Sequence, residues 1–241
     1  MSSHSITNSK IIVALDYADA NSALALVDKL DPTLCRLKVG KELFTVCGPQ
    51  LVEKLVAKKY DVFLDLKFHD IPNTVAKACE AASKLGIWML NVHASGGLDM
   101  MQAAKLGVAN SGHTPYLIAV TVLTSSNQAM LESIGVTASM QEQVLKLAKL
   151  THGAGLDGVV CSALEVSLLR AALPGTFCLV TPGIRPAHAN HDDQTRVVTP
   201  LDAVTLGSDY LVIGRPITQS ADPIQTILDI NQSLALPKMV V

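Results

Sequence analysis

The stretch that decides the fold is "DVFLDLKFHDIPNTVAKACEAASKLGIWMLNVHAS", residues 61–95. It begins with an apolar run at 61–68 and ends with a second one at 87–95. Between them, residues 73–86 carry apolar side chains at helical spacing, and Gly86 stands where a helix commonly ends. Continuous apolar runs are typical of strands buried on both faces, as in a parallel sheet. The stretch therefore predicts a strand–helix–strand unit.

The same alternation continues along the whole chain. Further apolar runs are "IIVALDY" (11–17), "CRLKVG" (35–40), "YLIAVTVLT" (116–124), "DGVVCSA" (157–163), "TFCLVTPG" (176–183) and "DYLVIGRP" (209–216). Further helical patterns cover residues 20–30, 49–59, 139–155 and 222–235. Eight strands in 241 residues predict an α/β fold, a single-domain (β/α)₈ TIM barrel over residues 1–241, with residues 1–9 or so as a polar extension. A doubly wound open sheet is the second choice, disfavoured because no GxGxxG follows an early strand.

Composition narrows the class of protein. The net charge is −2 and no segment is strongly basic or acidic, which argues against binding of nucleic acid or of a membrane surface. No signal-peptide pattern and no apolar stretch of about 18 residues occurs, so we expect no membrane span. The five cysteines show no CxxC spacing, and histidines near the strand ends form no HxH or HExxH pattern. We therefore expect reduced thiols, a cytoplasmic location and no metal site.

Charged residues stand at the ends of the first three predicted strands. Asp16, Lys38, Asp65 and Lys67 follow or end apolar runs, where an unpaired charge is costly to bury. Residues two apart on a strand face the same side, and barrel closure would bring Lys38 beside Asp65 and Lys67. Asp70 lies past the strand end and would reach back or across to another subunit. We expect an alternating Lys–Asp–Lys–Asp array at the carboxyl ends of the strands, with a purely structural ion network as the alternative.

A second group of residues indicates an anion site. The long polar loop 182–196 follows the seventh strand, and Gly214 and Arg215 end the eighth. The loops after strands seven and eight are the usual phosphate site of a barrel. Gly214 would offer a backbone N–H and Arg215 a bidentate guanidinium. Arg185 and Gln194 would close over the anion from the loop; the alternative is a plain surface connection.

The segment "DLKFHDIPNT" strongly resembles the signature of the orotidine 5′-phosphate decarboxylase family. Three further segments match in order: "ALDY" at the first strand, "LKVGKELF" at the second, and "TPGIRP…DDQTRVVTP…GRPIT" near the C-terminus. The resemblance spans Ile11 to about Leu234 and is closest to the bacterial form. It implies decarboxylation of orotidine 5′-phosphate (orotidine monophosphate) to UMP without any cofactor, the last step of de novo pyrimidine synthesis.

The resemblance also implies roles for the residues at the strand ends. Lys67 would protonate C6 of the pyrimidine as carbon dioxide leaves. Asp65 would lie against the departing carboxylate and orient Lys67. Lys38 would complete the network and contact the ribose, Asp16 would bind the ribose hydroxyls, and Thr124 would meet the pyrimidine edge.

For the phosphate, the resemblance implies that Arg185, Gln194, Gly214 and Arg215 hold it and that Pro182 lines the pocket. This assignment agrees with the anion site expected from the loop positions.

The resemblance further implies a homodimer in which Asp70 and Thr74 reach the partner's site. Two alternatives stay open. Related hexulose-phosphate synthases and keto-gulonate-phosphate decarboxylases use Mg²⁺, but they carry an acidic residue where this chain has Lys38, and a lysine would repel the metal. A catalytically inactive barrel that serves as a binding module is the other alternative, and the complete charged set argues against it.

Overall fold

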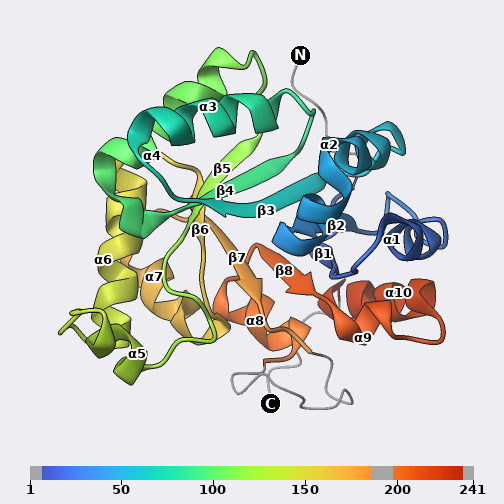
Figure 1. Ribbon diagram of the computed structural model, residues 1–241. Coiled ribbons are helices and arrows are strands. Elements are labelled where there is room, and N and C mark those ends of the chain that lie inside the picture. Colours follow the sequence, from blue (N-terminus) through green and yellow to red (C-terminus); the bar gives the residue numbers. More distant parts are fainter. Residues whose placement is uncertain (1–6, 186–197, 236–241) are drawn as a thin grey trace, which may run out of the picture.

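Eight parallel strands close into a barrel in the computed structural model, which describes residues 7–185 and 198–235. The strands are β1 (Ile11–Leu15), β2 (Arg36–Gly40), β3 (Val62–Phe68), β4 (Met89–His93), β5 (Tyr116–Val120), β6 (Gly158–Val160), β7 (Cys178–Pro182) and β8 (Tyr210–Ile213). Each strand pairs with the next along the chain, and β8 pairs back with β1 (Figure 1). The predicted (β/α)₈ barrel is confirmed, and the open sheet is excluded.

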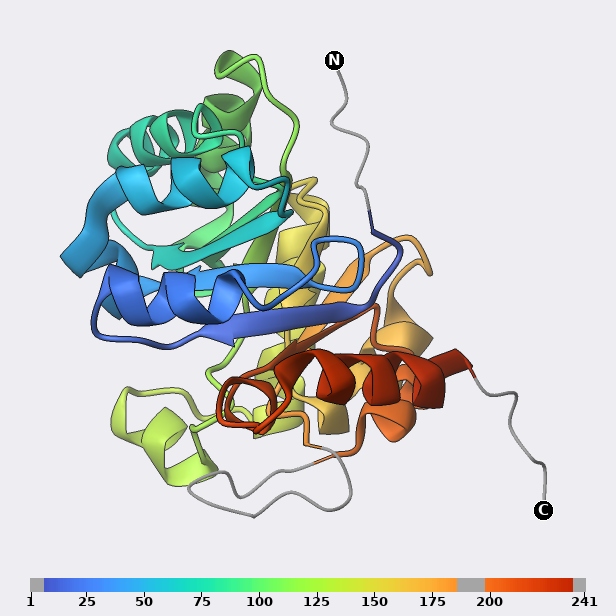
Figure 2. The same ribbon diagram turned by 90° about the vertical axis from the view of Figure 1, so that its right-hand side faces the viewer.

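Helices surround the barrel on the outside, as both views show (Figures 1 and 2). They are α1 (Ala20–Val27), α2 (Lys41–Ala57), α3 (Pro72–Ser83), α4 (Gly97–Asn110), α5 (Gln128–Ser133), α6 (Met140–Gly153), α7 (Val166–Ala172), α8 (Pro200–Leu206), α9 (Arg215–Thr218) and α10 (Pro223–Ala235), with short 3₁₀ turns at η1 (Ala94–Gly96) and η2 (Ala163–Glu165). Over the ranges that the structure describes, no helix combines the length and the apolarity needed to cross a bilayer.

The helix predicted at 49–59 is the second part of a longer element. α2 starts at Lys41 and is interrupted at Gly48, whose φ of 67° breaks the helical path. Pro49 therefore lies in the first turn of the second part, where a missing N–H costs nothing. Asp19 caps the N-terminus of α1, because its carboxylate accepts a hydrogen bond from the Ser22 N–H.

Alternate residues of the strands pack into two separate apolar layers. On β1, Ile11 and Val13 belong to the layer between the barrel and the helices. Ile12 and Ala14 belong to the layer inside the barrel, together with residues such as Phe63. Both faces of the strands are thus buried, which is why the sequence shows unbroken apolar runs.

The amino-terminal end of the barrel is closed by a stacked cation. The Arg36 guanidinium lies 4.6 Å from the Trp88 ring centroid and 5.0 Å from that of Tyr210. It donates hydrogen bonds to the carbonyls of Thr7 and Ser9, so residues 7–9 lie against this end of the barrel. The aromatic and guanidinium groups fill this end, and the space for a ligand lies at the other.

Candidate active site

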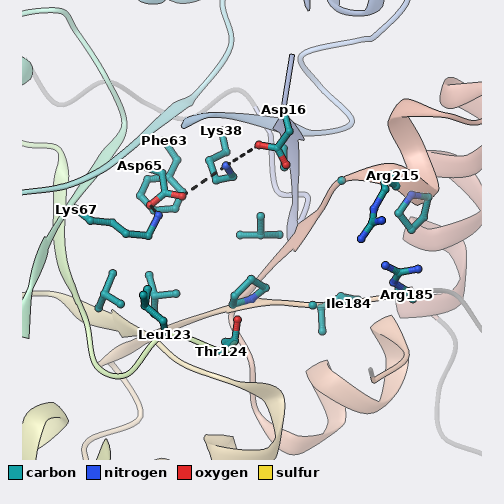
Figure 3. A pocket seen from close by; sticks show the side chains of 18 of the residues that line it. Asp16, Lys38, Phe63, Asp65, Lys67, Leu123, Thr124, Ile184, Arg185 and Arg215 are labelled. Carbon is teal, nitrogen blue, oxygen red and sulfur yellow. Dashed lines mark hydrogen bonds and ion pairs between the residues drawn. The ribbon is translucent and has the colours of Figure 1, made fainter. Parts of the chain in front are cut away.

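A cavity of about 560 Å³ opens at the carboxyl ends of the strands (Figure 3). That volume suits a small organic ligand, and this end of a TM barrel is where active sites occur. Most of the residues that the sequence predicted for the site line this one cavity: Asp16, Lys38, Asp65, Lys67, Thr124, Pro182, Arg185, Gly214 and Arg215.

Three members of the predicted charge array, Lys38, Asp65 and Lys67, lie together at one end of the cavity, and Asp16 takes the place expected for Asp70. Lys67 Nζ lies 2.7 Å from Asp65 Oδ1, and Lys38 Nζ lies 3.5 Å from Asp65 Oδ2. Lys38 Nζ also lies 3.3 Å from Asp16 Oδ1, so cations and carboxylates alternate as expected (Figure 3). Lys38 and Asp65 are buried, whereas the Asp16 side chain is 68% exposed. The array therefore runs from the cavity wall to its mouth, where Asp16 can reach a ligand.

Gly40 leaves room for the ammonium of Lys38. A Cβ on Gly40 would lie 3.2 Å from Lys38 Nζ, which is closer than ordinary van der Waals contact. A side chain at this position would require the ammonium to shift by a few tenths of an ångström. The sequence analysis did not single out Gly40, although its position directly after "LKV" is a signal that could have been used.

The backbone around Lys67 departs from a regular strand. Lys67 has a φ of +54°, in the left-handed region that non-glycine residues rarely adopt. The pairing of β3 with β4 shifts from Leu64↔Leu90 to Phe68↔Val92. Over this interval β3 advances by four residues while β4 advances by two. Asp65 and Lys67 do reach the same cavity as predicted, but through an irregular strand and not through regular alternation.

Asn91 is the residue at this irregularity that sequence reasoning missed. Its side chain is fully buried and donates a hydrogen bond from Nδ2 to Asp65 Oδ1 at 2.7 Å. Its Oδ1 accepts the backbone N–H of Lys67 at 2.8 Å. A lone asparagine inside the apolar run "IWMLNVHAS" was the available signal, because a buried amide needs partners.

Two arginines mark the opposite end of the cavity. Arg185 and Arg215 lie together there, away from the lysine–aspartate array (Figure 3). The backbone N–H of Arg185 donates to the backbone carbonyl of Val198 at 3.1 Å, and Ile184 forms a β-bridge with Val198. These bonds join the described flanks of the loop that was expected to close over an anion.

Between the two charged ends the cavity wall is largely apolar. Gln194, the remaining residue expected at the phosphate, lies outside the described residues. The site residues predicted from the sequence did not include the apolar lining or Gln219, a polar residue near Arg215. The apolar lining residues are Phe63, Val120, Val122, Leu123, Val160, Ile184 and Val212. A flat, weakly polar ring would fit against such a wall.

Asp70 and Thr74 do not line the cavity. Asp70 lies in a separate open depression with His69 and Ile71, and its Oδ1 accepts the Ile71 N–H at 2.7 Å. Thr74 is exposed in the first turn of α3. The neighbouring Ile71 side chain is 67% exposed. Both residues are therefore outside the cavity of their own chain, and their expected contribution to a partner's site stays a prediction.

His93 stands beside the array at the end of β4. Its ring centroid lies 5.4 Å from that of His69. Burial lowers the pKa of His93, and the nearby His69, Lys41 and Lys67 lower it further, so its neutral form is favoured at pH 7. Within residues 7–185 and 198–235, no three histidine, cysteine or acidic side chains are grouped so that they could hold a metal ion. Neutral His93 therefore adds no charge to the lysine–aspartate array beside it.

Comparison with known proteins gives the family. The model of the orotidine 5′-phosphate decarboxylase / HUMPS family matches residues 9–230. The chain belongs to this family. It is 58% identical over 233 residues to the orotidine 5′-phosphate decarboxylase of Shewanella sediminis, covering 96% of this chain and 100% of that one. It is 58% identical over 230 residues to the enzyme of Chromobacterium violaceum, covering 95% and 93% of the two chains.

Solved structures of the family share the fold. The crystal structure of orotidine 5′-phosphate decarboxylase from Lactobacillus acidophilus aligns with a TM-score of 0.85 at 41% identity, covering 94% of this chain and 99% of that one. An uncharacterised conserved protein from Geobacillus kaustophilus aligns with a TM-score of 0.83 at 38% identity, covering 93% and 99%. Membership in this family agrees with the resemblance seen in the sequence motifs.

Proposed function

We propose that this chain decarboxylates orotidine 5′-phosphate to UMP and carbon dioxide in pyrimidine synthesis, and that Lys67 is the proton donor. Family membership and the relatives at 58% identity support the activity. The observation that carries the assignment of the site is the pairing of two charged ends in one cavity. The Lys67 ammonium, 2.7 Å from Asp65, lies at one end, and Arg185 and Arg215 lie at the other.

Orotidine 5′-phosphate fits a cavity with these two charged ends. Its phosphate would bind between Arg185 and Arg215, with the Gly214 N–H and Gln194 as further donors. Its ribose hydroxyls would meet Asp16 and Lys38, which already pair at 3.3 Å. The phosphate is remote from the reacting carbon, so its binding energy can hold the base against the charge array.

The pyrimidine would then lie between the apolar wall and the array. Thr124 would contact its edge, and Pro182 would line the pocket beside it. Both residues line the cavity. The C6 carboxylate would point toward Asp65 and Lys67.

The chemical step needs a cation at C6. The bond between C6 and its carboxylate carbon breaks, carbon dioxide leaves, and the electron pair remains on C6. The Lys67 ammonium stabilises this carbanion and transfers one proton from Nζ to C6, after which the amine regains a proton from water. Asp65 holds the ammonium in place before the reaction, and such preorganised electrostatics is usually the largest contribution to catalysis.

We expect activity to be independent of metal ions. Lys38 Nζ lies between Asp16 and Asp65, at 3.3 and 3.5 Å, where a divalent cation would otherwise bind carboxylates. Purified protein treated with EDTA should consume orotidine 5′-phosphate, followed by the change in ultraviolet absorbance, at the rate of untreated protein. Loss of activity with EDTA and its recovery with Mg²⁺ would instead favour the activity of a Mg²⁺-dependent hexulose-phosphate synthase or keto-gulonate-phosphate decarboxylase. Binding of UMP without any turnover would favour an inactive barrel.

The site is proposed to be completed by a second copy of the chain. Asp70 and Thr74 are exposed beside Ile71, and none of the three lines the cavity of its own chain. An exposed isoleucine beside two polar residues at the edge of the site is suited to contact with another protomer. In a homodimer, Asp70 would extend the partner's array beside its Lys67, and Thr74 would contact the partner's substrate.

Mixed dimers test this arrangement. Lys67→Ala and Asp70→Ala proteins should each be nearly inactive, but co-expression should recover about a quarter of wild-type activity, because half of the dimers are mixed and each has one complete site. Co-expression of Lys67→Ala with a chain that carries both substitutions offers no complete site and is the control. Activity no higher than that of the two parents would show that Asp70 serves its own chain.

We also propose a cytoplasmic location. The support is the cysteine set, since Cys35, Cys79, Cys161 and Cys178 are buried free thiols and Cys47 is half-buried. Unpaired thiols are usual where the surroundings are reducing.

A further inference from the structure

The irregular segment of β3 carries both members of the reacting ion pair. Between the pairs Leu64↔Leu90 and Phe68↔Val92, three residues of β3 (65–67) lie opposite a single residue of β4, two more than a regular ladder would hold. Asp65 and Lys67 lie in this segment, and Lys67 has the left-handed φ of +54°. A backbone conformation of this kind persists only where surrounding contacts hold it.

Asn91 provides such contacts from the opposite strand. It is the β4 residue between the two flanking pairs, and its side chain is completely buried. Its Oδ1 accepts the Lys67 N–H, and its Nδ2 donates to Asp65 Oδ1. The orientation of the amide is fixed by chemistry, because a backbone N–H only donates and a carboxylate only accepts.

One oxygen is common to both interactions. Asp65 Oδ1 accepts from Asn91 Nδ2 at 2.7 Å and lies 2.7 Å from Lys67 Nζ. Asn91 therefore fixes Lys67 twice, once through its main chain and once through the carboxylate that holds its ammonium. An ionised aspartate at position 91 would lack the donor to Asp65. Alanine would lack both this donor and the acceptor for the Lys67 N–H.

We propose that Asn91 is a positioning residue that holds the Lys67 ammonium at the reacting carbon. This inference rests on the proposed function of Lys67. Loss of the amide would let the backbone at Lys67 relax toward an extended conformation and would move Nζ away from Asp65. Phosphate binding would be unaffected, because Arg185 and Arg215 lie at the opposite end of the cavity from Lys67.

Alanine substitution gives the first test. Asn91→Ala should lower kcat by about 10²-fold, the size of effect that a displacement of about 1 Å can have, and should leave the dissociation constant of UMP unchanged. Thr181→Val is the matched control, since Thr181 is equally buried and its Oγ1 makes a side-chain hydrogen bond of 2.8 Å to Ser208, which lies between α8 and β8. The control should keep wild-type kcat. Equal kcat in Asn91→Ala and Thr181→Val would overturn the inference.

Asn91→Asp gives a signature that a merely structural role would not produce, and it decides the matter if the alanine variant does not fold. The introduced carboxyl is nearly isosteric and, when protonated, can donate to Asp65 as the amide does. When ionised, it repels Asp65. The ratio of variant to wild-type kcat should therefore rise as the pH falls through the titration of that carboxyl. A ratio that is constant with pH would contradict the inference.

Hydrogen exchange separates this inference from the proposed activity, because it needs no turnover. The Lys67 amide should be protected in the wild type and in Thr181→Val, and should exchange faster in Asn91→Ala. If the Lys67 amide exchanges faster in Asn91→Ala but the wild type does not decarboxylate the substrate, only the proposed function is contradicted. Unchanged exchange beside normal wild-type turnover would contradict the positioning role alone.

Discussion

Replacing Lys67 by alanine should slow the turnover of orotidine 5′-phosphate by about 10⁴-fold or more while UMP still binds. The substitution removes the proton donor and also the cation that opposes negative charge at C6. General acids commonly contribute about 10²–10⁴-fold, and a preorganised charge about 10²–10³-fold. The two contributions fall on the same side chain, so its loss should exceed either one.

The variant should remain folded. The Lys67 side chain is 24% exposed, so its removal opens no internal cavity. Asp65 keeps its hydrogen bond from Asn91 at 2.7 Å and its ion pair with Lys38 at 3.5 Å. The thermal midpoint should therefore change little, and the loss should be seen in kcat.

Lys58→Ala is the matched control for Lys67→Ala. Lys58 also forms an ion pair of 2.8 Å, with Asp28, but it lies at the exposed C-terminal end of α2 and does not line the cavity. That variant should keep wild-type turnover. Turnover of Lys67→Ala close to that of Lys58→Ala would show that another group delivers the proton.

Replacing Arg215 by alanine should lower kcat/KM by about 10²-fold or more, chiefly through a higher KM. Loss of one partner from a buried pair of charges costs about 2–5 kcal/mol, and each 1.4 kcal/mol is a factor of about ten. Arg215 lines the cavity at the end that is remote from Lys67, so its loss should weaken anion binding and leave the chemical step in place. The dissociation constant of UMP should rise in parallel.

The nucleoside orotidine provides an internal control for Arg215. It has no phosphate, so the wild type and Arg215→Ala should convert it equally slowly. Arg215→Lys should give an intermediate KM for the nucleotide, because lysine keeps the charge but loses the bidentate geometry. Unchanged kcat and KM for the nucleotide in Arg215→Ala would place the phosphate site elsewhere.

The strands could be predicted from the sequence because both of their faces are buried, which leaves unbroken apolar runs. Several helices could not. α4 begins at Gly97 with no side-chain cap and contains a second glycine, Gly107, so it lacks the usual signals of a helix start. A Cβ on Gly107 would lie 2.1 Å from the Ala76 carbonyl oxygen, so the close approach of α4 to α3 requires this glycine. Packing between helices, which a single sequence does not reveal, determines this element.

The candidate site was predictable where function needs charge at strand ends, as with Asp16, Lys38 and Arg215. Its supporting geometry was not. The left-handed backbone at Lys67 and the register shift beside it depend on Asn91 from another strand, and regular alternation predicted neither. Asp70 shows the converse case, since its motif position was clear and only coordinates show that it lies outside its own chain's cavity.

The central claim is that an ammonium group at position 67 performs the chemistry, and a chemical rescue tests it most directly. Lys67→Cys should be nearly inactive, and treatment with 2-bromoethylamine should convert the new thiol to a side chain that again carries an ammonium at similar reach. Four of the five native cysteines are buried and Cys47 is half-buried, so Lys67→Ala treated in the same way controls for modification elsewhere.

Aminoethylation should raise the turnover of Lys67→Cys by at least about 10²-fold and leave that of Lys67→Ala unchanged. Turnover that stays at the level of Lys67→Ala, although mass spectrometry shows modification at position 67, would contradict the central claim.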